Sequence, residues 1–140
     1  MVEKVEFELV SPEELLISQP VDMVVVPGGE GYYGVLAGHI PMITTVRSGA
    51  ICLYEGMRIM DRIFVTGGFA EVTFERVTVL VEKAIKVSDL DRASVEQEIK
   101  NLIEDVEDAK NEDERLKVAE RLEISRNMLQ AIVEAAAYRS

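Results

Sequence analysis

The sequence predicts an α+β protein in which an all-β sandwich is followed by an antiparallel α-helical hairpin. Through the first 87 residues, short strand-like runs alternate with glycine-rich turn signals. From residue 88 onward, apolar residues recur at spacings of three and four, which is the period of a helix. No glycine or proline follows Gly68. We therefore expect a β-sandwich over residues 1–87 and a two-helix hairpin over residues 88–140.

The strand predictions begin near the N-terminus. Val5, Phe7 and Leu9 alternate with charged residues, and this period of two predicts a half-buried strand. Ser11 and Pro12 interrupt it. Further strands are expected where apolar and β-branched residues cluster between turn signals. These strands cover residues 15–18, 21–26, 42–46, 50–54, 58–65, 70–74 and 77–82.

The helices are predicted from two apolar stripes that a polar segment, residues 109–114, separates. Residues 88–91 match a capping box, so Ser88 is expected to cap the first helix. Because matching stripes on two linked helices can pack together, we expect an antiparallel pair. The first stripe is Val95, Ile99, Leu102, Val106 and Ala109, and the second is Val118, Leu122, Ser125, Leu129, Ile132 and Ala136.

Composition and charge exclude several classes of protein. A chain of 140 residues with 48% hydrophobic residues can bury a core, which argues against disorder. The net charge of -11 argues against nucleic-acid partners and against adhesion to anionic lipid. No apolar run approaches the roughly 18 residues that span a bilayer, so membrane insertion is not predicted. The single cysteine and the acidic N-terminus suit a protein that stays in a reducing compartment where it is made.

Residues 29–34 (GEGYYG) match the G-x-G-x-x-G pattern of dinucleotide-binding proteins. That site requires a helix directly after the glycines, with its N-terminus toward the pyrophosphate. Gly38 and Pro41 would break such a helix, so we reject this interpretation. The glycines are instead expected to shape a loop. Tyr32 and Tyr33 in that loop either face a partner protein or pack on the edge of the sandwich.

The residues that could carry chemistry are few. His39 is the only histidine, and no orienting partner or nucleophile accompanies it in the sequence. Cys52 is the only cysteine and lies in an alternating apolar run, which predicts a strand residue. No spacing of His, Cys, Asp or Glu matches a metal site. Neither a metal site nor an active site of its own is predicted, and His39 is expected to shape a loop or an interface.

An ordered set of motifs resembles a known family. Residues 30–41 read E-G-x-x-G-x-x-x-G-H-x-P, residues 9–12 read LVSP, and residues 67–72 (GGFAEV) precede VTVL at residues 77–80. In order and spacing, residues 7–90 resemble the epsilon subunit of bacterial F-type ATP synthase, the counterpart of the mitochondrial delta subunit. The remaining residues resemble it in architecture only.

The resemblance implies a ten-stranded sandwich and a helical hairpin in a non-catalytic rotor subunit of the central stalk. The sandwich would bind the gamma subunit and the c-ring, peripherally, at the cytoplasmic face of the bacterial plasma membrane. The hairpin would be a regulatory arm that can extend toward the alpha and beta catalytic subunits and inhibit hydrolysis. The residues implied to face the c-ring are Glu30, Gly31, Tyr32, Tyr33, Gly34, Gly38, His39 and Pro41.

The chain departs from the family pattern at two places. Family members often carry an acidic residue where Tyr32 stands, so a ring contact here would be aromatic. Some members bind ATP through an [IL]-D-x-x-R-A motif, but Ser94 and Val95 replace its last two residues. These replacements count against ATP as a cofactor.

Two other interpretations stay open, an ATP-sensing module and a generic sandwich adaptor. If ATP bound, its candidate residues would be Asp91, Arg92, Arg121 and Arg126. Three arginines on the second helix have another possible role. They could contact an acidic surface or simply face solvent, and they are Arg115, Arg121 and Arg126.

Overall fold

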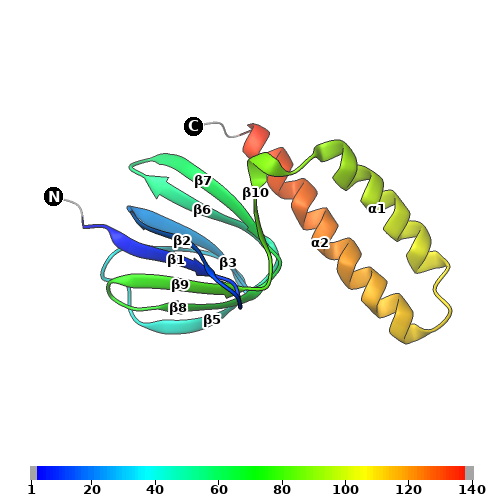
Figure 1. The fold of residues 1–140 in the computed structure, drawn as a ribbon, viewed down its shortest axis with the longest axis horizontal. Helices are drawn as coiled ribbons and strands as arrows, with labels where there is room; N and C mark the ends of the chain where they lie inside the picture. The colour runs from blue at the N-terminus through cyan, green and yellow to red at the C-terminus, as the bar shows by residue number, and fades with distance from the viewer. Residues whose placement is uncertain (1–2, 138–140) are drawn as a thin grey trace. The chain divides into compact units, whose positions relative to one another are not determined.

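The computed structural model describes residues 3–137. Within them the chain forms two compact units, and the boundary between these units falls between Lys86 and Val87. The first unit contains ten β-strands, and the second contains one 3₁₀ turn and two α-helices (Figure 1). The predicted fold class, a β-sandwich followed by a helical hairpin, is confirmed.

The strands form two layers that meet at one corner. One layer has the order β10-β7-β6-β3-β4, the other has the order β5-β8-β9-β1-β2, and pairing of Gly28 with Val46 joins them. All neighbours are antiparallel except β1 and β9. The bounds are β1 (Val5–Val10), β2 (Leu15–Val21), β3 (Met23–Gly28), β4 (Gly31–Val35), β5 (Met42–Val46), β6 (Gly49–Glu55), β7 (Arg58–Val65), β8 (Gly68–Val72), β9 (Arg76–Val81) and β10 (Ala84–Lys86).

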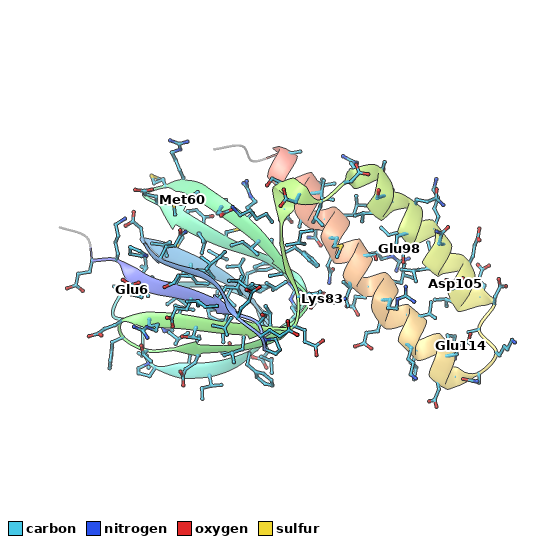
Figure 2. The ribbon with its side chains drawn as sticks, in the orientation of Figure 1. Glu6, Met60, Lys83, Glu98, Asp105 and Glu114 are labelled. Carbon is cyan, nitrogen blue, oxygen red and sulfur yellow. The ribbon has the colours of Figure 1, made fainter. Side chains whose placement is uncertain are left out.

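The hydrophobic core lies between the two layers. Side chains fill the space between them (Figure 2). Val5, Phe7 and Leu9 of β1 are fully buried and the residues between them are not, so the predicted alternation is confirmed. The same alternation supplies buried residues from other strands, because each layer has one face toward the core. They include Val24, Val26, Ile51, Leu53, Ile63, Val65, Ala70, Val72, Val77 and Val79.

The glycine-rich segment differs from its prediction. It was expected to be a loop, but Gly31–Val35 is strand β4, and only Gly29 and Glu30 form a turn. Gly31 has a φ of 141°, a backbone conformation that other residues rarely adopt, and this allows the tight reversal. The following residues then pair with β3 in register. Strand pairing has therefore overridden the turn signal that the glycines give in the sequence.

The second unit contains the 3₁₀ turn η1 (Val87–Asp89) and the helices α1 (Arg92–Glu107) and α2 (Glu112–Ala137). The prediction that Ser88 caps α1 is wrong. Asp91 is the N-cap, and its carboxylate accepts a hydrogen bond from the backbone N–H of Ser94 at 3.2 Å. Ser88 lies within η1, three residues before Asp91, so it is too far ahead of α1 to cap it.

The seam between the two helices is narrow. Val95 and Leu102 of α1 are buried, as are Leu122 and Ser125 of α2. The other stripe residues are half-buried or exposed. Charged side chains cover the remaining surface of the helices, and Figure 2 shows several of them projecting from the hairpin. In residues 3–137, neither helix is long and apolar enough to cross a membrane.

Candidate functional site: the β4 edge, an outer sheet face and the helical hairpin

The turn between β3 and β4 places Glu30 at an exposed tip. Gly28 pairs with Gly31, which leaves Gly29 and Glu30 as the two residues of the turn. The Gly29 N–H donates to the Thr45 carbonyl at 3.1 Å, so the turn is held against β5. This hydrogen bond fixes the position of Glu30 relative to the corner of the sandwich.

The two tyrosines of β4 have different environments. Tyr32 is 49% exposed, and the guanidinium carbon of Arg47 lies 5.0 Å from the centre of its ring. That distance suits a cation–π interaction, which holds both side chains at the surface. Tyr33 packs against the core, and its hydroxyl lies 2.5 Å from that of Thr44. Tyr32 is therefore exposed and Tyr33 is partly buried, so the alternative in which both pack on the sandwich is wrong, and contact of Tyr32 with a partner protein stays a prediction.

The connection between β4 and β5 carries the remaining residues of the candidate ring contact. Gly38 has a φ of 85°, and its N–H donates to the Phe74 carbonyl at 2.8 Å. His39 Nδ1 lies 2.7 Å from the carbonyl oxygen of Ile40, which makes Nδ1 the protonated nitrogen in this contact. Pro41 is exposed and directly precedes β5.

The eight candidate residues therefore do not form one loop. Glu30 lies at one end of β4, and Gly31, Tyr32, Tyr33 and Gly34 lie along it. Gly38, His39 and Pro41 lie beyond its other end. Within the described residues β4 pairs with β3 alone, so it is an edge strand of its layer. The structure therefore spreads the candidates along this edge and beyond its two ends.

Sequence reasoning missed an apolar groove on the outer face of the layer β5-β8-β9-β1-β2. Phe69 of β8 and Leu80 of β9 are paired across the strands, and they are 59% and 49% exposed. They line a groove of about 370 Å³ together with Val10 and Pro12. The sequence of residues 77–81 (VTVLV) does indicate this groove. A strand with only one buried face would carry a polar residue where Leu80 stands.

The candidate nucleotide-binding residues of the hairpin already have partners in most cases. Ser94 donates to the Asp91 carboxylate through its hydroxyl at 2.6 Å and through its backbone N–H. These two hydrogen bonds lower the pKa of Asp91. Arg92 pairs with Glu96 at 3.6 Å, and Arg121 pairs with Glu98 at 3.4 Å.

The Glu98–Arg121 pair shows which residues of the two antiparallel helices are level with each other. Arg126 is exposed and follows Arg121 by five residues on α2. At 1.5 Å per residue, Arg126 is level with the first turn of α1, where Asp91 and Arg92 lie. The candidate residues thus gather toward one end of the hairpin, although among the described residues no hydrogen bond or ion pair joins Arg126 to the others.

No group of three or more His, Cys, Asp or Glu within residues 3–137 is placed to hold a metal ion. In the same range, every buried side-chain nitrogen or oxygen has a hydrogen-bond partner. Cys52 is half-buried on β6.

Two family models match the chain, and between them they cover both units. Residues 4–87 match the β-sandwich domain of the ATP synthase delta/epsilon chain. Residues 91–138 match the C-terminal domain of the ATP synthase epsilon chain. The two matches divide the sequence close to the boundary between the units of the structure.

Curated relatives show the same similarity over nearly full length. The chain is 54% identical to the ATP synthase epsilon chain of Rhodospirillum centenum over 127 residues, which covers 87% of each chain. It is 47% identical to that of Paramagnetospirillum magneticum over 132 residues, which covers 94% of this chain and 99% of the relative.

Solved structures with the same fold come from mitochondrial ATP synthases. A chain from the Euglena gracilis assembly matches with a TM-score of 0.79 and 22% identity, over 97% of this chain and 82% of that one. A chain from the central stalk and c-ring of the Tetrahymena thermophila enzyme matches with a TM-score of 0.65 and 15% identity, over 94% and 98%. At these identities the likeness concerns the fold alone.

Proposed function

The chain belongs to the ATP synthase delta/epsilon chain family, and from this premise we propose that it is a non-catalytic rotor subunit of a proton-translocating F-type ATP synthase. Its role is to join the gamma subunit to the c-ring in the central stalk, so that torque passes between proton flow and ATP synthesis. The observation that carries the proposal is that family similarity extends over both units and over nearly the whole length of the relatives.

The sandwich, residues 1–87, is the coupling body in this proposal. A subunit that transmits torque must deform little under load, and close-packed protein interiors have low compressibility. The core between the layers is continuous from β1 through β9. The corner is closed by the Gly28–Val46 pairing and by the contact between Tyr33 and Thr44. These features support a stiff body.

The c-ring contact is proposed to follow the edge strand β4. Glu30 and Tyr32 are exposed at one end of it, and His39 and Pro41 lie beyond the other end. Tyr32 presents an aromatic ring with the Arg47 cation over it, where the family resemblance implies that an acidic residue often stands. The ring contact would therefore rest on aromatic and cationic groups here.

The hairpin, residues 88–140, is proposed to be a regulatory arm. Its narrow seam leaves most of both helices exposed, which suits an element that changes partners. Extension along gamma would bring it to the alpha and beta catalytic subunits, where it would inhibit ATP hydrolysis. The alternative role in ATP sensing would require a nucleotide to compete with Ser94 for Asp91, or with carboxylates for Arg92 and Arg121.

The proposed location is the cytoplasmic face of the bacterial plasma membrane, where the chain is held peripherally through the complex. A cell fractionation experiment tests this. The chain should sediment with membranes that contain the c-ring and should be released when the catalytic part of the complex is stripped away.

Co-elution of the purified chain with the gamma subunit of its own organism tests the central proposal. We expect a stable complex at near one-to-one on a sizing column, with or without ATP. A complex that changes with ATP would support the sensing alternative. A chain that elutes alone under all conditions would contradict the rotor assignment and favour an unrelated adaptor role.

A further inference from the structure

The turn between β6 and β7 carries two exposed methionines. Glu55 pairs with Arg58, which leaves Gly56 and Met57 as the two residues of the turn. Met57 is 98% exposed, and Met60 of β7, labelled in Figure 2, is 45% exposed. The other methionines of the described residues are half-buried, and they are Met23, Met42 and Met128. The thioether groups that solvent reaches are therefore concentrated at this turn.

The β6–β7 turn is held in a defined position. Gly56 has a φ of 63°, a backbone conformation that glycine adopts without strain. Its N–H donates a hydrogen bond to the Asp22 carboxylate at 2.5 Å, so the turn is tied to the residue between β2 and β3. The strand pairing continues from Glu55 and Arg58 into the sheet. Met57 is therefore exposed because the fold presents it at the tip of a fixed turn.

A β-bulge sets the direction of Met60. Tyr54 of β6 pairs with Ile59. The preceding Leu53 pairs with Asp61, which leaves Met60 as the extra residue on β7. A bulge of this kind bends its strand and re-aims the side chains around it. Beside it lies a cleft of about 430 Å³, which we call the β6–β7 cleft, and its lining residues are Glu55, Arg58, Ile59 and Met60.

Oxidation of a methionine adds a polar oxygen to an apolar side chain, and its cost depends on where the sulfur lies. Met42 packs against the hydrophobic core, so a sulfoxide there would bring a polar group among apolar side chains. At Met57 the added oxygen would lie in water. At Met60 it would lie in the cleft that Arg58 also lines, and a guanidinium donates hydrogen bonds to such an acceptor. The turn is thus suited to accept oxygen without loss of the fold.

We propose that the β6–β7 turn is a site of reversible methionine oxidation, where peroxide converts first Met57 and then Met60 to the sulfoxide. In each step the sulfur lone pair attacks one oxygen of hydrogen peroxide, so that an S–O bond forms and the O–O bond breaks. The thioether loses two electrons, and the second oxygen leaves as water. This turn consumes oxidant that would otherwise reach Met42, and the inference is independent of the proposed function.

Reduction restores the two side chains. A methionine sulfoxide reductase returns the sulfoxide to the thioether with two thiols as the reductant. The thiols become a disulfide, and the oxygen leaves as water. Because Met57 and Met60 are exposed, such an enzyme reaches them without unfolding the chain.

Peroxide treatment of the full chain, followed by mass spectrometry of its peptides, tests the order of oxidation. Each methionine is compared in the native chain and in the chain unfolded by urea, where all have similar exposure. The ratio of the unfolded rate to the native rate should be about 1 at Met57 and about 2 at Met60, because susceptibility follows exposure. It should be larger at Met23, Met42 and Met128. Equal ratios at all five positions would overturn the proposal.

Met57→Leu combined with Met60→Leu tests whether the turn protects Met42. Leucine has a similar volume and carries no sulfur to oxidise. When peroxide is limiting, this variant should carry more sulfoxide at Met42 than the unchanged chain does. The matched control is Met23→Leu, which removes a half-buried methionine and should leave the sulfoxide at Met42 unchanged. An equal amount at Met42 in the double variant and the unchanged chain would show that the turn does not intercept the oxidant.

Thermal unfolding of the oxidised chain gives a second measurement. The midpoint should stay that of the untreated chain while only Met57 and Met60 carry oxygen, and it should fall once Met42 is oxidised. A fall at the first stage would show that the turn does not tolerate the sulfoxide. Peptides from cells exposed to peroxide test the site where the chain works. Oxidation of Met57 before Met42 supports the proposal there, and protection of both Met57 and Met60 would overturn it, because a partner would then cover the turn.

Discussion

The hydroxyl of Tyr33 lies 2.5 Å from the hydroxyl of Thr44, and this contact joins the edge strand of one layer to the edge strand of the other. Tyr33 also packs closely over Gly28, where an added Cβ would lie 2.8 Å from the tyrosine ring. The ring fills space and the hydroxyl links the layers. These two contributions can be separated by substitution.

Tyr33→Phe should lower the free energy of unfolding of the sandwich by about 0.5–1.5 kcal/mol, because it removes the hydrogen bond and keeps the ring. Urea denaturation followed by circular dichroism measures this change. Thr44→Val removes the other partner and serves in a double-mutant cycle. The double variant should lose less unfolding free energy than the sum of the losses in the two single variants. Strict additivity would show that the two hydroxyls do not interact in solution.

The strands that face the core could be predicted from the sequence, and the strand that carries the candidate ring contact could not. Val5, Phe7 and Leu9 alternate because one face of β1 is buried, and this leaves a clear pattern. In β4 the pattern is weak, since Gly31 and Gly34 contribute no side chains. Its strand character comes from pairing with β3, which is a tertiary contact that local composition does not reveal.

The groove depends even more on long-range pairing. Leu80 and Val10 are neighbours only because β9 runs parallel to β1, and the register of that pairing is not encoded in either strand alone. The motifs in residues 30–41 identified the family and its candidate residues. They did not show that these residues are spread along an edge, because the turn after β3 looked like part of one long loop.

Gly68→Ala should strongly destabilise the sandwich or prevent its folding. Gly68 has a φ of 155°, and an added Cβ would lie 1.9 Å from the backbone oxygen of Leu80, so the backbone itself would have to shift. Gly31→Ala is the matched control, because Gly31 has a φ of 141° and nothing lies within 4 Å of an added Cβ.

Both glycines have a φ that would strain an alanine in their place. The difference in stability between the two variants therefore isolates the steric clash at residue 68. Thermal unfolding should give a much lower midpoint for Gly68→Ala than for Gly31→Ala, which should cost about 1–2 kcal/mol. Equal midpoints would mean that β8 and β9 can separate at this point without loss of stability.

Leu102→Ala should destabilise the helical hairpin by about 2–5 kcal/mol, because Leu102 is 1% exposed in a seam with few buried residues. Ile103→Ala is the matched control on the next residue of α1, where the side chain is 38% exposed. Hydrogen exchange of the α1 and α2 amides measures the effect separately from the sandwich. Similar protection in the two variants would contradict the position of the seam.

Asp22 links two parts of the sandwich, and the stability of the sandwich should depend on its ionisation. Its carboxylate accepts the Gly56 N–H at 2.5 Å and pairs with Lys4 at 3.2 Å. The Gly56 hydrogen bond, followed by the Lys4 side chain, holds the pKa of Asp22 below its usual value of 3.8. In the unfolded chain that pKa returns to its usual value, so between the two pKa values the unfolded state binds more protons.

The contribution of Asp22 to stability is therefore fully present above about pH 4–5 and is lost as the pH falls through the lowered pKa of the folded state. Asp22→Asn removes this titration and should flatten the acid limb of a plot of unfolding free energy against pH from 2 to 6. Because Lys4 is exposed and Asp22 is only half-buried, added salt should weaken the Lys4 part of the effect, while the Gly56 hydrogen bond remains. Glu55→Gln, which removes an exposed carboxylate beside the same turn, is the matched control. Parallel acid limbs for the unchanged chain and Asp22→Asn would show that the carboxylate does not anchor the β6–β7 turn.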